Sequence, residues 1–106
     1  MRISAPQKAV LIALYAIALR QGDNHPVPLM VLFNAVNSER MRKNERPVAD
    51  RNFRTSCHTM VGHGLLHKFR DKQNLQLLFS LTPAGAETAR TLYLQFLSES
   101  SADGVE

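Results

Sequence analysis

Seven side chains that can form hydrogen bonds fall between positions 51 and 59. They are Arg51, Asn52, Arg54, Thr55, Ser56, His58 and Thr59. Arginine can pair with guanine through two hydrogen bonds and asparagine with adenine, while serine and threonine suit phosphates, base edges or a thymine methyl group. A helix face that is merely solvated would favour glutamate and lysine, which form helices more readily. The segment is therefore a candidate for contact with nucleic acid.

The same region holds residue types that occur in catalytic and metal sites. Asp50, Ser56 and His58 are the types of a catalytic triad, but residues crowded on one helix cannot surround a substrate. Four possible metal ligands also cluster: Cys57, His58, His63 and His67. Cys57 falls on an apolar stripe, and Gly64 interrupts the helix on which the last two histidines would face together. We therefore predict no catalytic residues, no metal and no cofactor, and that the protein is not an enzyme.

The positive charge of the chain is concentrated in its middle third. Between Arg40 and Lys72 there are nine basic and three acidic residues, a net charge of +6, whereas the rest of the chain carries −2. Such a concentration is typical of a surface that meets a polyanion. Within this middle third, the basic residues outside the segment 51–59 are Arg40, Arg42, Lys43, Arg46, Lys68, Arg70 and Lys72. We predict that all seven contact DNA, although a solvated basic surface would show the same charge.

Hydrophobic periodicity predicts four helices and one hairpin. The first helix covers residues 7 to 20, with Ser4 and Gln7 at the spacing of a capping box and Gly22 able to take the left-handed position that ends it. The second helix covers residues 28 to 37. Residues 38 to 46 are compatible with helix or loop.

A third helix spans about 50 to 62, with an apolar stripe of Phe53, Cys57, Met60 and Val61. Two apolar runs between 65 and 81 are joined by a polar turn. The second run alternates as a strand with one buried face: Leu75, Leu77, Phe79 and Leu81 lie on that face, and Gln76 and Ser80 lie on the other. Thr82 and Pro83 begin a fourth helix that ends near Ser98, before a flexible polar tail at 99–106.

Length and composition indicate a single domain, residues 1–98. A chain of 106 residues with 44% hydrophobic residues can bury one core without disulfides, and its one cysteine fits a reducing compartment. An apolar run near the amino terminus is too short to cross a bilayer. We expect a cytoplasmic, nucleoid-associated protein with no membrane partner.

The order helix, helix, helix, strand, strand, helix is mainly α with a small β-hairpin (α+β). With it, the stretch "TMVGHGLLHKFRDKQNLQLLFSLTPAGAE" resembles the winged helix-turn-helix superfamily. MarR-type and PadR-type transcriptional regulators carry a similar glycine-leucine turn, a basic wing tip and a Leu-Thr-x-x-Gly exit. The first half, "APQKAVLIALYAIALRQG", resembles the winged-helix domain of archaeal origin-recognition initiators. The connection before the third helix is longer than the usual turn of about 3–4 residues.

The resemblance implies a protein that binds double-stranded DNA and regulates transcription. The helix at about 50–62 would lie in the major groove, and the hairpin 65–81 would be the wing. Two alternatives remain: a DNA-binding protein of replication initiation or plasmid maintenance, and a winged-helix adaptor between proteins. Apolar residues on more than one side of the last helix predict a homodimer through the first and last helices, or simple packing of those helices on each other.

Overall fold

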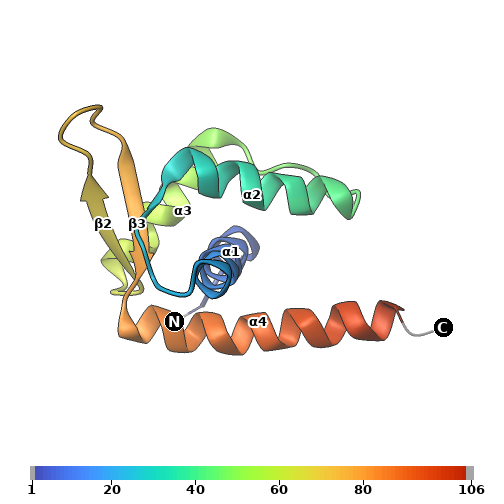
Figure 1. Cartoon of the computed structure of the whole chain (residues 1–106). Helices are drawn as coiled ribbons and strands as arrows, with labels where there is room; N and C mark the ends of the chain where they lie inside the picture. Colours follow the sequence, from blue (N-terminus) through green and yellow to red (C-terminus); the bar gives the residue numbers. More distant parts are fainter. Residues whose placement is uncertain (1, 105–106) are drawn as a thin grey trace.

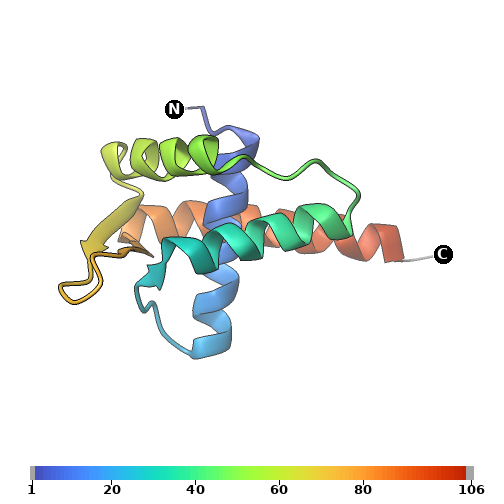
Figure 2. The same cartoon turned by 90° about the horizontal axis from the view of Figure 1, so that it is seen from above.

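The computed structural model describes residues 2 to 104, which form four helices and a three-stranded sheet. Along the chain these are α1 (Ala5–Gln21), β1 (Val27–Pro28), α2 (Leu29–Arg42), α3 (Asp50–Gly62), β2 (Leu66–Arg70), β3 (Leu77–Leu81) and α4 (Pro83–Gly104). Helix α1 lies between α2 and α4 (Figures 1 and 2), and the hairpin of β2 and β3 projects from one end of the molecule. The predicted order of helices and hairpin is confirmed.

Helix α1 is the central element of the fold. Ser4 and Gln7 form the predicted capping box: each backbone amide donates to the other residue's side-chain oxygen, at 3.0 and 3.4 Å. At its other end Gly22 adopts φ +83°, a conformation that suits glycine because it has no Cβ. The helix contacts α2, α3, α4 and β3. Its ends are therefore fixed locally, and its middle is fixed by packing against these four elements.

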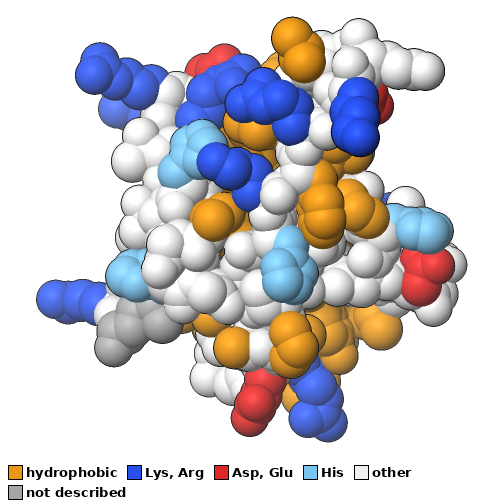
Figure 3. Space-filling model, turned by 90° about the vertical axis from the view of Figure 1, so that its left-hand side faces the viewer, with side chains coloured by type: hydrophobic (Ala, Val, Ile, Leu, Met, Phe, Trp, Pro, Cys, Tyr) orange, Lys and Arg blue, Asp and Glu red, His pale blue; other side chains and the backbone are white. Residues whose placement is uncertain are grey.

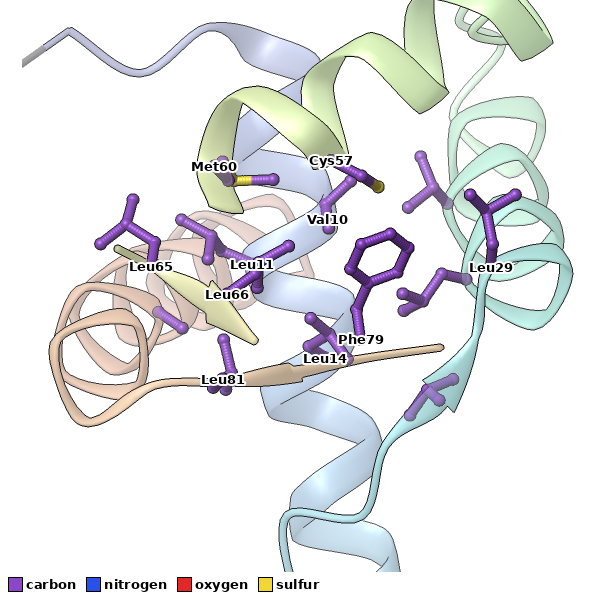
Figure 4. Close-up of a cluster of buried hydrophobic side chains, with 14 of the residues drawn as sticks. Val10, Leu11, Leu14, Leu29, Cys57, Met60, Leu65, Leu66, Phe79 and Leu81 are labelled. Atoms are coloured by element: carbon purple, nitrogen blue, oxygen red, sulfur yellow. The ribbon is translucent and has the colours of Figure 1, made fainter. Parts of the chain in front are cut away.

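The core forms where the helices meet the sheet. Figure 4 shows side chains from α1, α3, β3 and the α3–β2 turn pointing toward one another. Its largest fully buried members are Phe53, Phe79, Leu11, Leu14, Leu32, Met60, Val10 and Cys57. Phe33 of α2 adds an edge-to-face contact with Phe53 of α3, with ring centroids 5.2 Å apart. This contact fixes α3 on α2, in an arrangement that aromatic rings prefer.

The sheet has one more strand than the sequence predicts. Its order is β1-β3-β2 and both pairings are antiparallel, with Val27 opposite Phe79. Asn24 continues the β1 side of the sheet: its side-chain nitrogen donates to the Leu81 carbonyl at 2.8 Å, and its side-chain oxygen accepts from the Leu81 amide at 3.3 Å. Because β3 is the central strand, both its edges are paired. It also contacts α1, α2 and α4, and Ser80 is buried rather than exposed as the alternating pattern predicts.

Several predicted boundaries are wrong. Helix α2 begins at Leu29, after Pro28 pairs with β3, and it extends through part of the ambiguous segment to Arg42. Residues 99–104 continue α4 and do not form the predicted tail, and the last two residues of that tail lie outside the described part of the chain. Strand β3 begins at Leu77, so Leu75 lies in the turn. Among residues 2–104, no helix is both long enough and apolar enough to cross a membrane.

Candidate nucleic-acid interface

Helix α3 presents a polar face because its opposite face is anchored in the core. A side-chain amide, Asn37 of α2, holds the connection to α3 by donating to the Val48 carbonyl at 3.1 Å and accepting from the Val48 amide at 2.8 Å. The α3 residues that face inward are Phe53, Ser56, Cys57 and Met60. Arg51, Asn52, Arg54, Thr55 and His58 are exposed, and Thr59 is half-buried.

The placement of Ser56 on the outer face is wrong. Ser56 lies three residues after Phe53 and four before Met60, so the helical period brings all three to the buried side. The sequence interpretation grouped Ser56 with its polar neighbours by residue type, whereas the position decides the direction of the side chain. Ser56 is thus removed from the side chains available to a ligand.

Two arginines on the exposed face of α3 differ in their partners. Arg54 donates from Nε to the Asp50 carboxylate one turn earlier, at 2.5 Å. In the described part of the chain, no carboxylate lies within ion-pair distance of Arg51. Arg51 is therefore the α3 cation whose charge is least neutralised by the protein itself.

The wing directs two basic residues along one side of β2. Leu66, Lys68 and Arg70 share one face, because side chains alternate along a strand, and Lys68 stands opposite the buried Phe79. The other face carries His67 and Phe69, whose rings lie 6.2 Å apart. Arg70 also donates from Nη1 to the Leu75 carbonyl at 2.9 Å, so it stabilises the wing turn. Lys72 lies exposed within that turn.

The basic residues in the last turn of α2 and just after it have contacts within the protein. Arg40 donates to the Arg46 carbonyl at 2.7 Å and so helps to shape the connection to α3. Arg42 forms two hydrogen bonds with Glu39, and these hold the pKa of the Glu39 carboxyl below its usual value. Lys43 lies 3.8 Å from Glu39 and 4.4 Å from the centre of the Phe96 ring of α4. Three of the predicted DNA contacts, Arg40, Arg42 and Lys43, therefore also have side-chain contacts within the protein, whereas Arg46 contributes its backbone carbonyl.

The exposed cations of the wing and of α3 lie at the same end of the molecule. Figure 3 views this end and shows basic side chains gathered in its upper part, where acidic side chains are few. The structure thus brings together two sets of residues that are separated in sequence: the polar face of α3 and the basic residues of the hairpin.

The four residues that could be metal ligands by type, Cys57, His58, His63 and His67, do not form a metal-binding group. Within the part of the chain that the structure describes, no three His, Cys, Asp or Glu side chains are placed to hold a metal ion. His58 faces outward, and its ring packs edge-on near Phe79 at 6.3 Å between centroids. Cys57 is fully buried, and this burial raises the pKa of its thiol to about 12.

We expect Cys57 to react with thiol reagents only when the protein unfolds. At neutral pH a thiol with a pKa of about 12 is almost wholly protonated, and the thiolate is the reactive form. Labelling at pH 8 across a urea series should follow the unfolding curve measured by circular dichroism. Above pH 9 the unfolded thiol ionises while the folded one keeps its proton, so the free energy of unfolding should fall. Rapid labelling without urea would contradict this burial.

A separate groove lies between α1, α2 and α4, on another part of the surface. Its volume is about 480 Å³. The floor consists mainly of alanine and isoleucine side chains of α1. Its sides are lined by Glu39 and Arg40 of α2, by Lys43 just after that helix, and by Tyr93 and Phe96 of α4. Both α2 and α4 pack on α1, and Lys43 contacts the Phe96 ring of α4.

With three packed helices, a hairpin wing and a closing helix, the chain has the winged-helix fold. It is similar in structure to SSV1 F-93, with a TM-score of 0.70 and 16% identity over 98% of this chain and 95% of that one. It is also similar to a chain of the Drosophila ORC bound to DNA, with a TM-score of 0.63 and 14% identity; this match covers 83% of the present chain and 23% of the ORC chain. No family model matches the sequence, and no curated protein sequence is similar to it.

Proposed function

We propose that this protein binds double-stranded DNA and regulates transcription in the cytoplasm, in association with the nucleoid. The observation that carries the proposal is the common position of the exposed α3 residues and the basic wing. A helix fits the major groove, and residues in its amino-terminal half contact base edges. Arg51 and Asn52 then read bases, Thr55 and His58 contact bases or phosphates, and the wing follows the neighbouring backbone.

The structural neighbour that is bound to DNA supports DNA binding as the task of this fold. The resemblance of the wing sequence to MarR-type and PadR-type regulators leads us to propose a role in transcription rather than the replication alternative. The adaptor alternative is less compatible with the charge, because Lys68, Arg70 and Lys72 of the hairpin add to the positive charge of Arg51 and Arg54 on α3. Binding energy on such a surface comes largely from phosphates.

Salt dependence tests the proposal directly. If about six basic residues meet phosphates, the logarithm of the association constant should fall with the logarithm of salt concentration at a slope of about −5. Fluorescence anisotropy with a labelled random-sequence duplex, measured from low to physiological ionic strength, provides the slope. Absence of binding at the lowest salt concentration would refute DNA binding and leave the adaptor function.

We further propose a homodimer in which α4 provides much of the contact. Leu94 and Leu97 are 52% and 43% exposed and lie one turn apart on α4. The inner side of the same helix packs on α1, where Tyr15 and Tyr93 have ring centroids 5.3 Å apart. Leu94 and Leu97 therefore do not contribute to the core of a single chain. A two-fold dimer would place two copies of α3 on successive half-sites of a palindrome.

Replacing both Leu94 and Leu97 with glutamate should convert the dimer to a monomer. The substitutions place charge on an apolar contact, but they leave the core of each chain unchanged because both side chains are exposed. Sedimentation equilibrium measures the mass, and circular dichroism checks the fold. Met30→Glu, a similar change at an exposed residue of α2, serves as the control. A wild-type protein that sediments as a monomer at micromolar concentrations would exclude the dimer.

A further inference from the structure

The tip of the wing is a rigid loop held by its own hydrogen bonds. The Asp71 amide donates to the Gln76 carbonyl and the Leu75 amide to the Asp71 carbonyl, both at 2.8 Å. The Asp71 carboxylate accepts from the amides of Gln73 at 2.8 Å and Asn74 at 3.4 Å. The Asn74 side chain accepts from the Gln76 amide at 3.0 Å. The loop conformation is therefore set before any ligand arrives.

Within this loop Leu75 has an unfavourable conformation and an unfavourable exposure. Its φ is +60°, a left-handed value that glycine or asparagine adopts more easily than a bulky residue. Its side chain is 63% exposed, so it gains little from burial in the isolated protein. Arg70 fixes the Leu75 carbonyl from the neighbouring strand at 2.9 Å. Backbone strain of this kind persists where the surrounding structure holds it, often at sites of binding.

The surroundings of Leu75 are those of a nucleic-acid contact. Lys72, Gln73 and Asn74 are exposed beside it at the tip, which projects beyond the body of the molecule in Figure 1. Asp71 is the one acid between residues 65 and 82, and its carboxylate is turned toward the loop amides. Proteins that bind the minor groove combine Arg, Lys, Asn and Gln with an apolar side chain that enters between base pairs.

We infer that Leu75 is an apolar wedge that enters the minor groove, partly unstacks one base-pair step and bends the duplex. The inference rests on the proposed DNA binding and adds a deformation of the DNA to it. Because the loop is already held by its own hydrogen bonds, presenting the leucine costs no further conformational entropy. The side chains of Lys72, Gln73 and Asn74 contact the edges of the groove. Because pyrimidine–purine steps unstack most easily, the wing should select a flexible step such as TpA at a fixed distance from the bases that α3 contacts.

Bending of a labelled duplex tests the wedge. A donor and an acceptor dye at the two ends of a duplex of about 30 base pairs, far shorter than the DNA persistence length, report the end-to-end distance by energy transfer. The duplex carries a central TpA step, and a second duplex carries an A-tract in its place. At saturating wild-type protein we expect a bend of roughly 20–90° on the first duplex and a smaller bend on the second.

Leu75→Asn should remove the bend while the protein still binds. Asparagine accepts the left-handed conformation, so this variant should fold at least as well as the wild type. Leu75→Phe, which keeps a large apolar group, should keep the bend, and Leu19→Asn, which removes an exposed leucine from α1, should not alter it.

Two outcomes would overturn the wedge, and they are distinguishable. If anisotropy shows that the wild type binds neither duplex at low salt, the proposed DNA binding fails and the wedge fails with it. If the wild type binds, but Leu75→Asn bends the duplex equally, only the wedge is refuted. In the second case sedimentation of Leu75→Asn would show whether the leucine instead packs against a second copy of the chain.

Discussion

Arg51→Glu is expected to weaken binding to duplex DNA by about 100-fold or more at moderate salt. Loss of a bidentate contact to guanine costs about 1–3 kcal/mol, and the new carboxylate adds repulsion from the phosphates; each 1.4 kcal/mol is tenfold in affinity. Arg51 is exposed and has no acidic partner among the described residues, so its replacement breaks no ion pair of the fold. Anisotropy titrations with wild-type and variant protein give the ratio.

The control for Arg51→Glu is Arg90→Glu, which changes the net charge by the same amount at an exposed position of α4. A general electrostatic effect would weaken both variants, whereas a contact from α3 weakens only the first. Loss of folding does not account for the effect, because a glutamate in the first turn of a helix interacts favourably with the helix dipole. Equal affinities for the wild type and Arg51→Glu would remove α3 from the interface.

Gly85→Ala is expected to destabilise the protein by about 3 kcal/mol or more. Gly85 lies in the first turn of α4, and a Cβ at this position would stand 1.9 Å from the carbonyl oxygen of Leu65. That oxygen accepts from the Thr82 amide at 3.1 Å, and the Thr82 hydroxyl donates to the Gly64 carbonyl and accepts from the Gly85 amide. The Cβ of the alanine is fixed to the α4 backbone, and the atoms it meets belong to the Leu65 backbone. No rotamer change can relieve this clash, so the wing must move away from α4.

Urea unfolding followed by circular dichroism measures this loss. For a domain of this size a change of about 3 kcal/mol corresponds to a fall in Tm of roughly 12 °C or more. The control is Gly62→Ala at the end of α3, where no atom lies within 4 Å of the new methyl group. Because alanine restricts the unfolded chain, that variant should be unchanged or about 0.4–1 kcal/mol more stable. Equal stability of the two variants would contradict the close approach at Gly85.

Local rules in the sequence predicted the helices and the wing well. The capping box at Ser4, the left-handed turn at Gly22 and the cap at Thr82 depend on residues within a few positions, and all three are present. Strand β1 could not be predicted in this way. It consists of two residues that pair with β3 about fifty positions later, and one of them is a proline. Pairing of this kind depends on tertiary contacts that no local pattern records.

The candidate site was predicted in composition but not in detail. The stripe of Phe53, Cys57 and Met60 indicated which face of α3 is buried, and the helical period applied strictly would also have placed Ser56 there. Glu39 lies one turn from Arg42 and Lys43, so their pairing was visible in the spacing. The contact of Lys43 with Phe96 could not be predicted from spacing, because the two residues lie far apart in the chain. The alternating pattern of the sequence also places Leu75 in the strand, whereas in the structure it lies in the wing turn before Leu77.

The short strand β1 also affects how the protein behaves when many copies are present. An unpaired strand edge can recruit another chain and start aggregation. On one side of the sheet the edge is two residues long, includes Pro28 and is continued by the Asn24 side chain. On the other side the edge strand β2 carries Lys68 and Arg70. The positive charge that would attract DNA therefore also repels the same edge of another copy, which should keep concentrated solutions free of strand-mediated assembly.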